Sequence, residues 1–142
     1  MKHFKILGLF SAFVVLMSAC SKKTEPVELN FESSTLYVDA DTAVVTLALD
    51  APATDHYPIK LTMESIGVAM GREFTIDPVS IYVNGTIYLT FPKGSTQQAF
   101  KIVKLSPVSE QQSPQVILGI DQTPAEILVG EHNQATIFFN HN

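Results

Sequence analysis

Short segments in which apolar and polar residues alternate occupy the chain from Val27 onward, and this period of two constrains the fold more than any other feature. Successive side chains of a β-strand point to opposite faces, so alternation predicts strands with one buried and one exposed face. No segment after Cys20 keeps apolar residues at helical spacing for three turns. We therefore expect no helix, and strands at residues 27–32, 36–38, 44–49, 59–64, 79–83, 87–91, 99–105, 115–120 and 135–139.

The clearest turn between two of these segments is Asn84-Gly85. Both residues tolerate the positive φ angles that a two-residue turn between antiparallel strands requires. Short strands without helices bury their apolar faces best when two sheets share one core. The pattern therefore predicts an all-β fold, an antiparallel, immunoglobulin-like sandwich of about seven to nine strands that occupies residues 27–142 as one domain.

The first 19 residues have the composition of a targeting segment and are set apart from this domain. Lys2 and Lys5 supply positive charge, and an uncharged, mostly apolar stretch follows from residue 6 to residue 17. This stretch is shorter than the ~20 apolar residues that a membrane-spanning helix needs. We therefore expect residues 1–19 to be a signal peptide that is removed on export.

The boundary Leu16-Met17-Ser18-Ala19-Cys20 resembles the lipobox of bacterial lipoproteins, although Met17 stands where Leu, Val or Ile is usual. A lipobox followed by one small sandwich is similar to lipoproteins of Bacteroidota. The resemblance implies cleavage after Ala19 and a covalent lipid on Cys20. The alternative is an ordinary signal peptide that leaves Cys20 as a free thiol, which would be reactive in an oxidising compartment.

Residues 20–26 form a short linker between the lipid and the first strand, and residues 21–26 reach ~20 Å when extended. We therefore expect the domain to lie close to a membrane of the cell envelope. The outer membrane is favoured, and the face that the domain occupies is left open. Of nine basic residues, seven remain once Lys2 and Lys5 leave, against 14 acidic residues. Since a nucleic acid needs a basic surface, no nucleic-acid partner is expected.

Two stretches of the domain resemble the Calx-β family. Residues 68–75, Val-Ala-Met-Gly-Arg-Glu-Phe-Thr, are similar to its Ala-x-x-Gly-x-Asp-Tyr segment, and residues 87–95 to the strand and glycine turn that follow. The resemblance implies an immunoglobulin-like sandwich, and calcium held by carboxylates from three places. Asp39 and Glu73 stand at the first two places, but residues 105–110 lack the acidic run of the third. Calcium takes about six to eight oxygen ligands, so Asp39 and Glu73 predict a weak site at best, and no cofactor is expected.

Motifs for catalysis are missing from the sequence. It contains neither a Gly-x-Ser-x-Gly nucleophile elbow nor a Gly-Lys-Ser/Thr phosphate loop. His56, His132 and His141 stand at no metal-ligand spacing from another histidine or from a cysteine. We therefore expect a protein that is not an enzyme.

Three binding roles are open for such a domain. Association with an envelope protein is favoured, because loops and strand edges offer backbone groups without special side chains. Glycan capture is the second role, for which exposed aromatic rings are typical. The chain has no tryptophan, and Tyr82 and Tyr88, on either side of the Asn84-Gly85 turn, are the candidate platform. A spacer stiffened by calcium is the third role.

Overall fold

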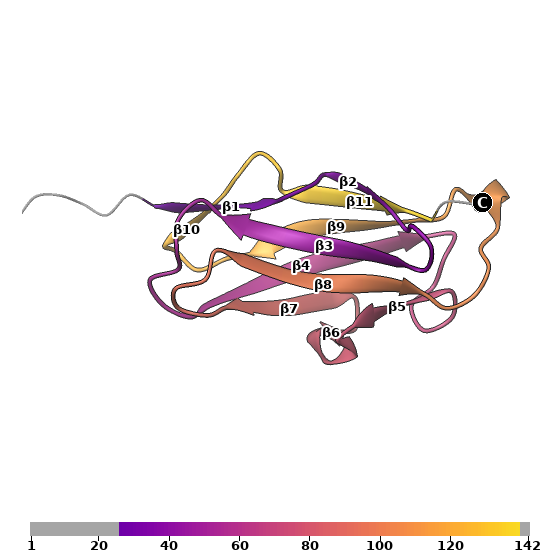
Figure 1. Cartoon of the computed structure of the whole chain (residues 1–142), viewed down its shortest axis with the longest axis horizontal. Helices are drawn as coiled ribbons and strands as arrows, with labels where there is room; N and C mark the ends of the chain where they lie inside the picture. Colours follow the sequence, from indigo (N-terminus) through magenta and orange to yellow (C-terminus); the bar gives the residue numbers. More distant parts are fainter. Residues whose placement is uncertain (1–25, 140–142) are drawn as a thin grey trace, which may run out of the picture.

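Residues 26–139 are described in the computed structural model, and they form eleven strands in two sheets that face each other across a common core (Figure 1). The five-stranded sheet has the order β10 (Ile127–Val129), β1 (Val27–Phe31), β3 (Thr42–Leu49), β8 (Gln97–Lys104) and β5 (Phe74–Asp77). The six-stranded sheet has the order β2 (Thr35–Tyr37), β11 (Gln134–Phe138), β9 (Gln115–Gln122), β4 (Tyr57–Ile66), β7 (Thr86–Phe91) and β6 (Tyr82–Val83). The predicted all-β sandwich is confirmed.

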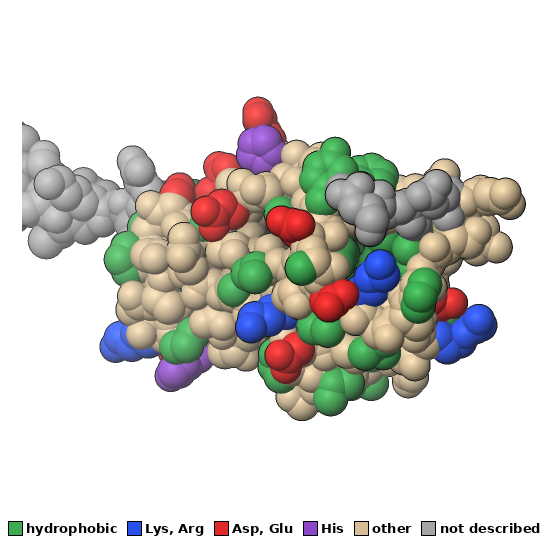
Figure 2. Space-filling model, turned by 45° about the vertical axis from the view of Figure 1, so that its right-hand side comes forward, with side chains coloured by type: hydrophobic (Ala, Val, Ile, Leu, Met, Phe, Trp, Pro, Cys, Tyr) green, Lys and Arg blue, Asp and Glu red, His purple; other side chains and the backbone are tan. Residues whose placement is uncertain are grey.

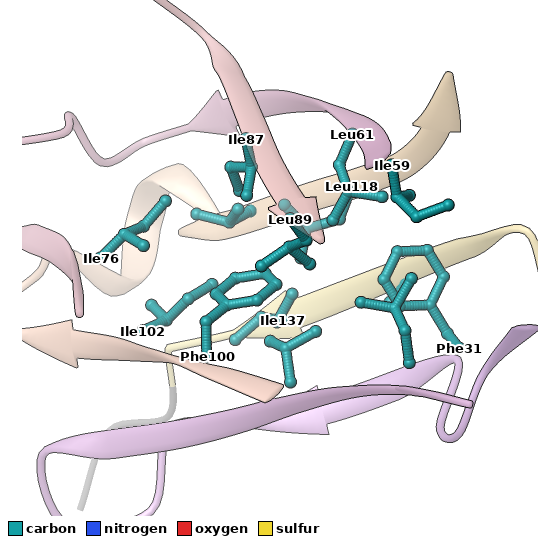
Figure 3. Packing of buried hydrophobic residues seen from close by; sticks show 14 of the residues in the cluster. Phe31, Ile59, Leu61, Ile76, Ile87, Leu89, Phe100, Ile102, Leu118 and Ile137 are labelled. Carbon is teal, nitrogen blue, oxygen red and sulfur yellow. The ribbon is translucent and has the colours of Figure 1, made fainter. Parts of the chain in front are cut away.

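Alternating side chains of the strands build the core. In β3, Val45 and Leu47 are fully buried, whereas Val44 beside them is half exposed. Figure 3 shows Leu89 of β7 and Phe100 of β8, which belong to opposite sheets, pointing into the same interior. Burying one such large apolar side chain stabilises the fold by about 1.5–3 kcal/mol. No polar or charged side chain of residues 26–139 is buried, so apolar packing alone fills this core.

The strand count and the strand directions differ from the prediction. The described residues form eleven strands instead of seven to nine, because the sequence pattern did not reveal β5 or β10 as strands. Two pairs are parallel, β1 with β10 and β2 with β11, so the sheets are mixed and not purely antiparallel. The first two strands, β1 and β2, belong to different sheets, and so do the last two, β10 and β11. Each sheet therefore has one of the first strands beside one of the last. Alternation reports which face is buried and carries no information on the direction of the neighbouring strand.

The segment before the Asn84-Gly85 turn is less regular than the predicted strand over residues 79–83. The 3-10 helix η1 (Val79–Ile81) follows a cis Asp77–Pro78 peptide bond, and only Tyr82–Val83 pair with β7. The reason is that the chain crosses here from β5 in one sheet to β6 in the other. The turn itself is confirmed, since Asn84 and Gly85 have φ angles of 47° and 85° and Val83 pairs directly with Thr86.

Two 3-10 helices, η1 and η2 (Glu110–Gln112), lie in the connections between the described strands. Over residues 26–139, the expectation of no helix therefore holds for α-helices and fails for these two short 3-10 helices. Within residues 26–139, no helix is both long enough and apolar enough to cross a membrane.

Asn30 fastens the edge strand β10 to β1. Its side chain donates to Oε1 of Glu28 at 2.9 Å and accepts the backbone N–H of His132 at 2.9 Å. Gly130 passes directly beneath this side chain, and its own N–H donates to the carbonyl of Leu29 at 2.9 Å. A Cβ on Gly130 would lie 2.2 Å from Oδ1 of Asn30, so only glycine fits at this position unless the Asn30 side chain moves.

The sandwich is elongated, and its two ends carry different loops (Figure 1). The end at which β1 begins, here called the N-terminal end, also carries the loops at residues 50–56, 92–96 and 123–126. The opposite end, here called the far end, carries the loops at residues 38–41, 67–73 and 105–114. The segments that the Calx-β resemblance singled out for calcium therefore all lie at the far end.

Candidate functional site

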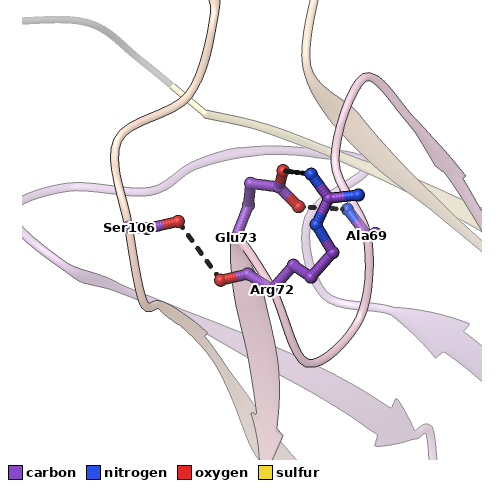
Figure 4. Close-up of polar contacts among 4 residues, drawn as sticks. All are labelled: Ala69, Arg72, Glu73 and Ser106. Atoms are coloured by element: carbon purple, nitrogen blue, oxygen red, sulfur yellow. Dashed lines mark hydrogen bonds and ion pairs between the residues drawn. The ribbon is translucent and has the colours of Figure 1, made fainter.

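Backbone hydrogen bonds join the three loops of the far end. The N–H of Leu105 donates to the carbonyl of Glu73 at 2.7 Å, and the N–H of Lys104 donates to the carbonyl of Asp41 at 2.7 Å. The hydroxyl of Ser106 donates to the carbonyl of Arg72 at 3.2 Å (Figure 4). The structure thus brings together the segments at which the Calx-β resemblance implied calcium ligands.

The carboxylate of Glu73 is engaged by its own loop (Figure 4). Its Oε2 accepts the backbone N–H of Ala69 at 2.9 Å, and its Oε1 faces Nη2 of Arg72 at 3.4 Å. The Glu73 side chain is 18% exposed, whereas that of Arg72 is 79% exposed. Because one oxygen closes the loop and the other faces a guanidinium, this carboxylate is poorly placed to ligate a cation.

Asp39, the other predicted ligand, lies on the exposed 38–41 loop and pairs through its backbone with Thr42. It lines a surface hollow of about 510 Å³ together with Tyr37 and Lys104. Among residues 26–139, no group of three or more His, Cys, Asp or Glu side chains is arranged to hold a metal ion. The described part of the far end thus lacks the cluster of carboxylates that typically supplies several of calcium's six to eight or so oxygen ligands.

Tyr82 and Tyr88 do not share a surface. Tyr82 pairs with Ile87, which is fully buried, and residues opposite each other in a sheet point to the same face. Tyr82 therefore points inward and packs against the core. Tyr88, the next residue after Ile87, points outward and is 50% exposed. The two-residue turn that makes these tyrosines neighbours in sequence thus separates them onto opposite faces.

Tyr88 has different neighbours on the outer face of the six-stranded sheet. Lys60 of β4 lies opposite Tyr88, and Gln122 of β9 lies opposite Lys60, so three side chains form a row across three strands. Nζ of Lys60 lies 3.8 Å from Oδ2 of Asp121. Alternation shows that Lys60 and Tyr88 both point outward, but the register that sets them side by side is visible only in the structure.

This row borders an open groove of about 480 Å³, here called the Tyr88 groove. Loops of the N-terminal end and the start of β4 contribute further residues to its wall, among them Asp55, His56, Pro58, Pro124 and Glu126. The groove therefore combines one exposed aromatic ring, two prolines and several hydrogen-bonding side chains. Sequence reasoning identified only Tyr88 as part of a binding surface, because the other residues come from two separate segments, at residues 55–60 and 122–126.

Cys20, the predicted lipid attachment site, and the signal peptide over residues 1–19 lie outside the described residues 26–139. The nearest described feature is β1, which begins at Val27. The predicted anchor would thus join the sandwich at its N-terminal end, on the side of the molecule where the Tyr88 groove also lies.

Comparisons with known proteins show the fold. No family model matches the chain, and no curated protein matches its sequence. The apo form of the Calx CBD1 domain is similar in structure, with a TM-score of 0.61 at 14% identity over 81% of this chain and 96% of that domain. The Calx CBD2 domain is similar with a TM-score of 0.59 at 9% identity, over 79% of this chain and 85% of that one.

A two-domain protein of unknown function from Bacteroides fragilis NCTC 9343 also shares the fold. Its TM-score is 0.53 at 7% identity, and the match covers 81% of this chain and 45% of that one. At identities this low, the structural similarity shows a common architecture and says nothing about ligands. The chain therefore has an immunoglobulin-like sandwich fold similar to that of Calx CBD domains, as the resemblance of residues 68–75 and 87–95 implied.

Proposed function

We propose that the chain is a non-catalytic lipoprotein, anchored through Cys20 to a membrane of the cell envelope, that binds another envelope protein with its far end. The observation that carries this proposal is the separation of the two ends. β1 begins at Val27, seven positions after Cys20, and the loops of the far end lie at the opposite tip of the sandwich (Figure 1). An anchor at Cys20 would hold the N-terminal end near the bilayer and direct the far end away from it.

The surface of the far end supports a protein partner. Tyr37, Ile66 and Leu105 end or follow strands there and are 53%, 37% and 51% exposed. Figure 2, turned so that this side comes forward, shows apolar side chains at the surface among scattered charges of both signs. Exposed large apolar side chains rimmed by polar groups are typical of protein-binding surfaces.

The architecture supports a role in binding. Calx CBD domains are among the structural neighbours of the chain, and their likeness is compatible with a module that performs no chemistry. At the far end of this chain, the carboxylate of Glu73 accepts the backbone N–H of Ala69 and so holds the 67–73 loop together. The far end is thus a closed surface built from backbone contacts, which suits recognition by shape.

A photocrosslinking amino acid placed at Leu105 tests the partner-binding part of the proposal in intact bacterial cells. We expect irradiation to give a discrete protein adduct from position 105. The matched control is the same amino acid at Lys93, an exposed residue in the 92–96 loop of the N-terminal end. No adduct from position 105, or the same adduct from both positions, would contradict binding through the far end.

Substitution of Cys20 tests the anchor separately. We expect Cys20→Ala to move the protein from the membrane fraction to the soluble fraction, because the acyl chains that hold it are lost. The adduct at position 105 should then fall in yield, since the partner and the domain no longer meet at the same membrane. A Cys20→Ala variant that stays in the membrane fraction would refute the lipid anchor.

A further inference from the structure

We infer that the Tyr88 groove is a binding site for an uncharged saccharide. The site lies on the outer face of the six-stranded sheet, away from the far end. The inference goes beyond the proposed anchored module and holds whether or not Cys20 carries a lipid. It rests on three features of the groove: its aromatic ring, its polar rim and its balance of charge.

The ring of Tyr88 offers an apolar surface in a fixed position. Tyr88 is half exposed, yet its backbone is held in the middle of β7 and paired with Lys60 of β4. Pro58 and Pro124 extend the apolar surface on the groove wall, and neither has a backbone N–H to satisfy. A pyranose ring has one face of C–H groups, and an exposed aromatic ring held rigidly is the surface against which such a face packs.

The rim of the groove supplies groups that suit hydroxyls. Gln122 can both donate and accept hydrogen bonds, His56 in its neutral form can do the same, and the carboxylates of Asp55 and Glu126 accept them. A sugar hydroxyl also donates and accepts. A groove with one apolar platform and a few convergent polar side chains therefore matches a ligand that has a C–H face and a rim of hydroxyls.

The charges around the groove argue against an acidic ligand. Lys60 is the cation of the row, and Asp121 neutralises it at 3.8 Å. Asp55 and Glu126 remain on the wall and would repel a phosphate, a sulfate or a uronic acid. An uncharged sugar meets no such repulsion.

The pairing of β4 argues against an added peptide strand. At Lys60, β4 pairs with Tyr88 on one side and with Gln122 on the other, so β4 has no open edge at this row. β7 pairs with β6 only at Thr86 and Ile87, so its edge at Tyr88 is open, but this edge lies on the side of β7 that faces away from β4 and the groove. An added strand gains its affinity from main-chain hydrogen bonds to such an edge. The floor of the groove offers side chains instead, and recognition by side chains is what a saccharide requires.

Calorimetric titration of the full chain, purified in detergent micelles, tests this site. The probes are the neutral hexasaccharides of glucose (both α- and β-linked), mannose, xylose and N-acetylglucosamine, with hexagalacturonate as the acidic comparator. We expect at least one neutral probe to bind and hexagalacturonate not to bind. Tyr88→Ala should weaken the binding by about tenfold or more, because the platform for the sugar face is lost.

Val44→Ala is the matched control, because Val44 is exposed to the same degree but lies on β3 of the other sheet. We expect it to bind the neutral probe as the unaltered chain does. Gln122→Ala, on an exposed position of the rim, should also weaken binding and provides a second variant should Tyr88→Ala lose its β-sheet circular dichroism. The inference is overturned if no neutral probe binds, if hexagalacturonate binds as tightly, or if Tyr88→Ala and Val44→Ala bind equally well.

Discussion

The backbone N–H of Ala69 donates a hydrogen bond to Oε2 of Glu73 at 2.9 Å, and this contact closes the loop that leads into β5. Arg72 faces the second oxygen at 3.4 Å. Glu73 stands at a position that the Calx-β resemblance assigns to a calcium ligand, but in this chain its carboxylate holds the backbone of its own loop. The carboxylate of Glu73 is thus bonded within the protein, and substitutions that remove these contacts should change the stability of the fold.

Replacing Glu73 separates the two contacts of its carboxylate. Glu73→Ala leaves the N–H of Ala69 without its acceptor, and we expect the free energy of unfolding to fall by about 1–2 kcal/mol. Glu73→Gln keeps an oxygen acceptor and loses only the ion pair with the exposed Arg72, so its cost should stay below about 1 kcal/mol. Urea unfolding measures both. Equal losses for the two variants would show that the hydrogen bond does not hold the loop.

Calcium should have little effect on stability, because only Asp39 and Glu73 stand at the expected ligand positions and Glu73 is engaged. We expect the melting temperature in millimolar calcium to match that in a chelator. A ligand that binds only the folded state raises this temperature in proportion to its occupancy. A clear rise with calcium and a fall with chelator would contradict our account of the far end.

Two glycines of the 67–73 loop form a matched pair. Gly67 and Gly71 have φ angles of 70° and 86°, so an alanine at either position is strained by about 1–2 kcal/mol. A Cβ at Gly67 would also lie 2.8 Å from the carbonyl oxygen of Gln112, whereas one at Gly71 meets nothing within 4 Å. We therefore expect Gly67→Ala to destabilise the protein clearly more than Gly71→Ala does. Thermal unfolding compares them, and equal losses would mean that Gly67 does not pack closely against Gln112.

Gly130 should be coupled to Asn30. The Cβ of Gly130→Ala displaces the Asn30 side chain, which then loses its bonds to Glu28 and to the N–H of His132, at a cost of about 1–2 kcal/mol. In an Asn30→Ala background, those bonds are already gone, so Gly130→Ala should cost much less. A double-mutant cycle by urea unfolding measures the difference. Additive losses would show that the two residues act independently.

The fold could be predicted from the sequence because one face of most strands is buried. Residues such as Val45 and Leu47 repeat with a period of two, and this repeat specifies both the strand and its inner face. The strand β10 escaped prediction because Leu128 and Val129 are both exposed and interrupt the alternation. The parallel pairs escaped it because strand direction depends on partners distant in sequence.

The candidate sites depend on register, which the sequence does not display. Tyr82 and Tyr88 are close in the chain, yet the turn pairs Tyr82 with Ile87 and sends the two rings to opposite faces. Tyr88 instead lies beside Lys60, and Gln122 lies on the other side of Lys60, although both are many residues away in the sequence. A single residue of the groove could thus be named in advance, and its neighbours could be found only from strand pairing.

The mass of the N-terminal peptide of the mature protein tests most directly whether this sandwich is a tethered module. The protein would be extracted from membranes, digested, and analysed by mass spectrometry together with its Cys20→Ala variant. We predict a peptide that begins at Cys20 and carries the added mass of a diacylglyceryl group, and no such mass in the variant. A mature protein that begins at Cys20 with an unmodified thiol, or that retains residues 1–19, would contradict the anchor and with it the orientation of the far end.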